Sequence, residues 1–92
     1  MDIFAQITEQ IIKQQESIIG PVALEQAKKV PGLSVDWQKH EVVFVGNKTD
    51  IIEKLVEKYE ELFGQASVEV CKDAVKTLLT TMPTSQIPPL LR

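Results

Sequence analysis

Residues that commonly build a metal or redox site are scarce in this sequence. Among 92 residues there is one cysteine, Cys71, and one histidine, His40. One cysteine cannot form a disulfide within the chain, and no second cysteine or histidine stands at zinc-ligand spacing from either residue. We therefore expect no metal and no cofactor. The expected location is the cytoplasm, where thiols stay reduced.

An excess of basic residues and a long apolar run are also missing. The net charge is −3, and ten Lys and Arg are spread among 13 Asp and Glu. A nucleic-acid surface needs a basic cluster, and a membrane-spanning helix needs about 20 consecutive apolar residues. We therefore expect neither a nucleic-acid partner nor a membrane. A composition of 43% hydrophobic and 25% charged residues is that of an ordinary globular domain.

What the sequence does contain is a repeated pattern centred on glycine. Residues 16–28 and 60–72 both read Glu, any, apolar, apolar, Gly, any, apolar, any, apolar, Glu, any, small, Lys. Each copy has the character of a helix end, a glycine break and a new helix start. No phosphate-binding motif surrounds either glycine, so Gly20 with Pro21, and Gly64, are interpreted as structural turns. The match favours an internal duplication.

Apolar residues recur at intervals of three and four, which predicts helices over residues 2–19, 21–30, about 50–63 and about 66–81. The polar pair Gln14-Gln15 interrupts the apolar stripe of the first helix. Asn47 or Thr49 is expected to cap the third. Cys71 falls on the apolar stripe of the fourth helix and aligns with Ala27 in the repeat. It is therefore expected to be a small buried packing residue rather than a reactive thiol.

Between the two copies the periodicity changes to that of strands. Residues 33–37 alternate apolar and polar side chains, and residues 41–45 are almost all β-branched or aromatic. The three-residue connector, residues 38–40, predicts a hairpin but contains no glycine, and its His40 is expected to be a surface turn residue. A hairpin alone is marginally stable. We therefore hypothesise that the hairpins of two copies form one four-stranded sheet.

These elements predict an α+β fold in the order ααββαα, with two helix-Gly-helix pairs flanking a central β-hairpin. Residues 1–82 would form a single domain. Residues 83–92 would be an extended, proline-rich tail. The tail is unusually apolar for a solvated segment, so we expect it to pack across the domain or onto a partner.

No catalytic constellation is present, so the leading hypothesis is a non-enzymatic module. It would bind protein, as a homodimer and in a regulatory or interaction role. The three candidate contact surfaces are the apolar second strand, the isoleucine-rich first helix and the apolar tail. Their candidate interface residues are Val42, Phe44, Ile87, Leu90 and Leu91.

Two alternative functions follow from other residues. An apolar ligand would be bound in a pocket lined by Trp37, Phe44, Tyr59 and Phe63. A winged-helix DNA-binding domain would use residues 21–30 as its recognition helix and Lys39-His40 as its wing tip. The acidic net charge, and the lack of a further helix before the turn unit, argue against DNA binding.

Overall fold

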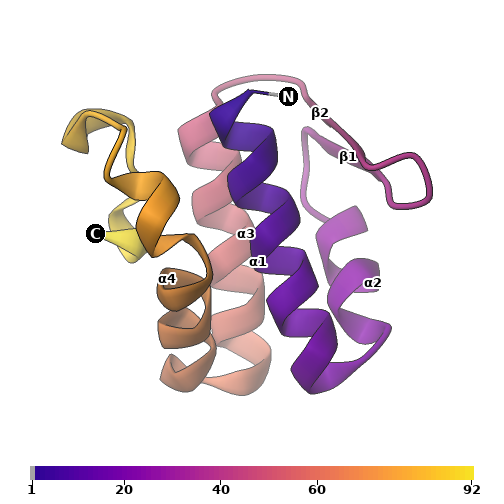
Figure 1. The fold of residues 1–92 in the computed structure, drawn as a ribbon. Helices are drawn as coiled ribbons and strands as arrows, with labels where there is room; N and C mark the ends of the chain where they lie inside the picture. The colour runs from indigo at the N-terminus through magenta and orange to yellow at the C-terminus, as the bar shows by residue number, and fades with distance from the viewer. Residues whose placement is uncertain (1) are drawn as a thin grey trace.

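The computed structural model describes residues 2–92 and confirms the predicted order of elements (Figure 1). Two strands pair as an antiparallel hairpin, with Leu33 opposite Phe44 and Asp36 opposite Glu41. The helices begin and end close to the predicted positions. The elements are α1 (Ile3–Ile19), α2 (Val22–Lys28), β1 (Leu33–Asp36), β2 (Glu41–Phe44), α3 (Lys48–Phe63) and α4 (Gln65–Leu79).

Helices α1 and α3 run in the same direction, and α2 and α4 run back, each in contact with both α1 and α3 (Figure 1). Both glycine turns consequently lie at one end of the bundle. The hairpin packs back onto α1 and α2, and the C-terminal tail packs back onto α3 and α4. Each helical pair is therefore covered by the segment that follows it in the chain.

The starts of α1 and α3 are capped and joined. Asp2 accepts a hydrogen bond from the Ala5 N–H at 2.9 Å, and Asn47 accepts one from the Asp50 N–H at 3.0 Å. Lys48 Nζ lies 3.1 Å from Asp2 Oδ2. The Ala5 N–H first, and Lys48 to a smaller extent, hold the pKa of Asp2 below its usual value. Asn47 is thus the cap of α3.

The two glycine turns have the same backbone conformation. Gly20 has φ 71° and ψ −152°, and Gly64 has φ 80° and ψ −171°. Each glycine N–H donates to the carbonyl four residues before it, that of Glu16 and that of Glu60. Residues with side chains essentially never adopt this combination of angles, so both turns require glycine. The prediction that Gly20 and Gly64 occupy equivalent turns is confirmed.

Two hydrogen bonds across the core join residues at matching positions of the two repeat units. Gln15 Nε2 donates to the Ser67 carbonyl at 3.1 Å, and Tyr59 Oη donates to the Ala23 carbonyl at 2.7 Å. In the repeat, Gln15 aligns with Tyr59 and Ala23 aligns with Ser67. Each unit therefore donates from one position of its long helix to the matching position in the other unit. This is the contact pattern of a pseudo-twofold axis parallel to the bundle.

The sequence predicted that Gln14 and Gln15 interrupt the buried stripe of α1. Gln15 is in fact buried, so the prediction is wrong for that residue. The amide reaches α4 and is bonded there, which removes the cost of burying it. The apolar core is matched in the same way. The buried pairs that align in the repeat are Ile7 with Ile51, Ile11 with Leu55, Ile12 with Val56, and Ala27 with Cys71.

Cys71 is buried as predicted, and its Sγ lies 3.3 Å from the Gln15 amide nitrogen. Burial raises the pKa of the Cys71 thiol to about 11, and the Gln15 hydrogen bond opposes this only in part. Burial also raises the pKa of Tyr59 above its usual value, and Cys71 adds to that shift. Both groups are therefore neutral at physiological pH.

The tail is not uniformly extended. It contains two 3-10 turns, Thr84–Gln86 and Pro89–Leu91, joined by extended residues. Pro88 and Leu91 are buried against the bundle. The Leu90 N–H donates to Glu53 Oε1 of α3 at 2.9 Å. The apolar side chains of the tail thus pack onto their own domain.

We predict that Gly20→Ala and Gly64→Ala each lower the free energy of unfolding by about 1–3 kcal/mol. No atom lies within 4 Å of a Cβ added at either position, so the loss would come from backbone strain alone. Urea unfolding measures it. Gln65→Ala, next to Gly64 in the exposed first turn of α4, is the matched control and should change stability little. An unchanged midpoint for either glycine variant would contradict the assigned turns.

We also predict that stability falls as the pH rises above 9. The unfolded thiol of Cys71 ionises near its ordinary pKa of 9.0, whereas the folded thiol keeps its proton to about 11. The unfolded state therefore binds fewer protons in this range, which lowers the free energy of unfolding by up to about 2 kcal/mol. Urea unfolding from neutral to alkaline pH measures the slope. In Cys71→Ala the decline in stability should begin at a higher pH, where the Tyr59 hydroxyl ionises in the unfolded state. A pH profile identical to that of the native protein would contradict the prediction.

Candidate interaction surface

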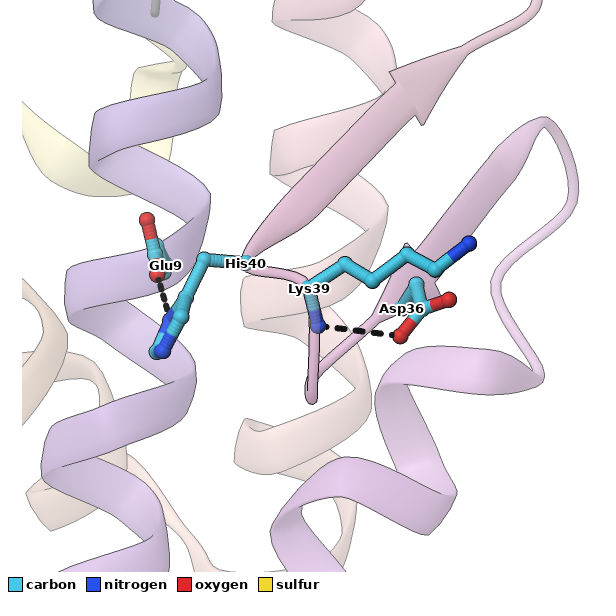
Figure 2. A network of polar contacts seen from close by, with 4 residues as sticks. All are labelled: Glu9, Asp36, Lys39 and His40. Carbon is cyan, nitrogen blue, oxygen red and sulfur yellow. Dashed lines mark hydrogen bonds and ion pairs between the residues drawn. The ribbon is translucent and has the colours of Figure 1, made fainter.

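The hairpin turn is built by two polar residues rather than by glycine (Figure 2). Asp36 Oδ1 accepts a hydrogen bond from the Lys39 N–H, three residues further on, at 3.2 Å, so a side-chain oxygen holds the turn closed. His40 adopts the left-handed conformation, with φ 53°. Histidine is among the residues that occupy this region more often than most. The sequence does carry turn chemistry here, although it lies in Asp36 and His40 and not in a glycine.

The same histidine anchors the turn to α1. His40 Nδ1 lies 2.6 Å from Glu9 Oε1, and the two side chains meet from elements far apart in the sequence (Figure 2). The Trp37 ring lies 6.1 Å from the imidazole. His40 is thus a surface residue, and its contact with Glu9 fixes the tip of the hairpin against the middle of α1.

A groove lies beside this pair. It holds a histidine–carboxylate pair, but none of its lining residues offers a hydroxyl or thiol nucleophile. Among residues 2–92 no group of three or more His, Cys, Asp or Glu is arranged to hold a metal ion. The lining residues are Glu9, Gln10, Lys13, Glu16, Trp37 and His40.

The two faces of β2 differ in what covers them. Val42 and Phe44 are half-buried against the core, and Lys48 Nζ lies 5.7 Å from the centre of the Phe44 ring. Val43 and Val45 point outward and are 54% and 74% exposed. The side chains of Val42 and Phe44, two of the candidate interface residues, therefore make contacts within the chain.

The backbone of these two residues has a different role. The Val45 N–H donates to the Gly32 carbonyl at 2.7 Å, and the register pairs Ser34 with Val43. Hydrogen-bonded pairs alternate along an antiparallel ladder, so Ser34 and Val43 exchange both bonds. The N–H and C=O groups of Val42 and Phe44 then point away from β1. Within residues 2–92 the sheet has only two strands, so this edge has no neighbouring strand.

Solvent reaches this edge through a groove between β2 and the first turn of α1. The groove is lined by Asp2, Ala5, His40, Glu41, Val42 and Val43. Of the residues of β2 itself, only Glu41 is charged. The edge therefore lacks the lysines, prolines and bulges that commonly protect a free strand from pairing.

The remaining candidate residues are dispersed. Leu91 is buried, and Ile87 and Leu90 are half-buried beside α3 and α4. The four aromatic residues proposed to line a ligand pocket do not meet in one cavity. Trp37 lies at the hairpin tip, Phe44 lies under Lys48, Tyr59 is in the core and Phe63 is 42% exposed at the glycine end.

Comparisons with known proteins add no functional information. No family model, no curated protein and no solved structure matches the chain. None of the helices in the described part of the chain is long and apolar enough to cross a membrane.

We predict that Glu9→Ala loosens the hairpin tip with little effect on global stability. The pair is exposed on the histidine side, so its loss is worth about 0.2–1 kcal/mol. Amide hydrogen exchange of Lys39 and His40 should accelerate by about two- to fivefold. Gln10→Ala, at the next position of α1, is the control and should leave these amides unchanged. Equal exchange in Glu9→Ala and the native protein would contradict the anchoring role.

Proposed function

We propose that the protein is a non-enzymatic interaction module that forms a homodimer through the open edge of β2. Two hairpins would then make one four-stranded antiparallel sheet. The observation that supports this is the unpaired edge of Val42 and Phe44 beside the exposed side chains of Val43 and Val45. Strand addition at a free edge is a common mode of protein association.

The edge is self-complementary about Val43. An antiparallel pairing centred there places Val42 opposite Phe44 of the second copy, and Phe44 opposite Val42. Because both residues direct N–H and C=O outward, each of these pairs exchanges two hydrogen bonds. Val43 lies against Val43 of the second copy on the outer face, where both side chains lose contact with water.

The hairpin is already supported by packing on α1 and α2. Pairing would add backbone hydrogen bonds at the edge of β2 and side-chain contacts between the two copies. Val43 and Val45 are the exposed large apolar residues of the hairpin. No charge lies at the centre of the proposed pairing, since Glu41 falls at its margin, opposite Val45 of the second copy.

The groove beside His40 has no hydroxyl or thiol side chain among its lining residues, which is in keeping with the non-enzymatic part of the proposal. The carboxylate of Glu9 is used to hold the turn. On this proposal, the histidine–glutamate pair fixes the orientation of the hairpin, which sets the direction in which the open edge faces.

Light scattering after size exclusion tests the proposal. We expect a mass of two chains at high micromolar concentration. Val43→Lys and Val43→Glu should each be monomeric with native circular dichroism, because the side chain is exposed but like charges would meet at the axis. We expect dimerisation at least about tenfold weaker for each variant alone, since two like charges would stand directly opposite each other on the outer face.

Mixing the two variants supplies the decisive comparison. The introduced lysine and glutamate carry opposite charges, so an equimolar mixture of Val43→Lys and Val43→Glu should recover the mass of a dimer. Ser34→Lys is the matched control, because Ser34 pairs with Val43 on the same outer face but belongs to β1. The proposal would be overturned if the native protein had the mass of one chain at every concentration. It would also be overturned if Ser34→Lys lost the dimer while the two Val43 variants kept it.

A further inference from the structure

Both glycine turns lie at one end of the bundle (Figure 1), and apolar side chains near these turns are exposed. Ile18 is 61% exposed, Leu62 51%, Phe63 42% and Val22 37%. Among the described residues the other exposed large apolar side chains are Val43 and Val45 of the hairpin. The apolar surface outside the hairpin is therefore concentrated at this end.

The pseudo-twofold axis relates the two halves of this apolar surface. Ile18 and Leu62 align in the repeat and lie in the last turns of the parallel helices α1 and α3. Phe63 aligns with Ile19, which is half-buried. Beside Ile18 runs a groove between α1 and α4. Its lining residues are Gln14, Ile18, Val70, Asp73 and Ala74.

Charge at this end is of one sign. Residues 15–26 and 59–70, which include both turns, contain no Lys, Arg or His, so all ten basic residues lie elsewhere. Neither ion pair found among residues 2–92 involves a carboxylate of these segments. The acidic residues of the two segments are Glu16, Glu25, Glu60, Glu61 and Glu69.

We propose that this end, which we call the acidic end, docks a basic amphipathic segment of a partner protein. Its apolar side chains would pack on Ile18, Val22, Leu62 and Phe63, and its Lys or Arg residues would meet the surrounding carboxylates. An apolar centre with a charged margin is the usual anatomy of a protein interface. Opposite charge adds specificity and speeds association.

A second copy is a poor occupant of this surface. Placed end to end, two acidic ends would bring ten carboxylates together with no basic residue from the same segments. The acidic end is also distinct from the β2 edge, because it is formed by the opposite ends of α1 and α3 from those that carry Asp2 and Lys48. Docking of a partner at the acidic end and pairing through β2 would therefore use different residues.

The test uses two designed amphipathic peptides with the same leucine face and either lysine or glutamate on the polar face. Titration into the labelled full chain is followed by the backbone amide NMR spectrum. We expect the lysine peptide to bind, with shifts concentrated at residues 18–22 and 62–66 and with weaker binding at higher salt. The glutamate peptide should bind at least about tenfold more weakly, because it meets like charge.

Matched variants locate the effect. Glu61→Lys should weaken the lysine peptide by about two- to fivefold, whereas Glu57→Lys, one turn earlier on α3 and outside the acidic end, should not. Ile18→Ser with Leu62→Ser should weaken it further while native circular dichroism is retained, since both side chains are exposed. Val43→Lys should bind the peptide as the native chain does, which separates this site from the β2 edge.

Three results would overturn the proposal. The first is equal affinity for the lysine and glutamate peptides. The second is a shift pattern centred on the hairpin or the tail. The third is an equal effect of Glu57→Lys and Glu61→Lys, which would show attraction by net charge without a defined site.

Discussion

The glycine-only conformation at Gly20 and Gly64 is the constraint on which the rest of the structure depends. It reverses the chain over Gly20-Pro21 in the first pair and over Gly64 alone in the second, so α1 and α3 are each followed at once by a helix that returns along them. Because both reversals occur at the same end, α1 and α3 run parallel, and α2 and α4 each pack against both of them. The hairpin and the tail then have to begin at the opposite end, where each covers its own pair of helices.

Parallel central helices also explain why two polar side chains are buried in the core. Gln15 and Tyr59 occupy matching positions and reach matching carbonyls in the opposite unit, so neither polar group is left without a partner. These bonds connect the two units where packing of apolar side chains alone would permit sliding. The match is not complete, because Thr8 stands where the second unit has Ile52, and its buried hydroxyl has no partner in the described chain.

Much of the fold could be predicted from periodicity and turn chemistry, because helix stripes and glycine breaks are local signals. The order of elements, the equivalent glycine turns and the burial of Cys71 belong to this class. Burial of Gln15 could not be predicted, since its partner lies on α4, far away in the sequence. The same holds for His40, whose anchor is Glu9. The apolar character of β2 is evident in the sequence. Which of its faces packs against the helices could not be predicted, because that depends on the path of the hairpin over α1.

Of the candidate interface, the sequence singled out β2 for its apolar residues but could not show which of its side chains and backbone groups stay exposed. The side chains of Val42 and Phe44 are used in packing, and their backbone groups remain at the open edge. The acidic end had no sequence signal of its own, because its residues come from two segments that are adjacent only after both glycine turns form. Together the proposals have one further consequence. A dimer joined through β2 would carry two acidic ends, and a partner with two basic segments would then bind through both, with an avidity that exceeds either contact alone.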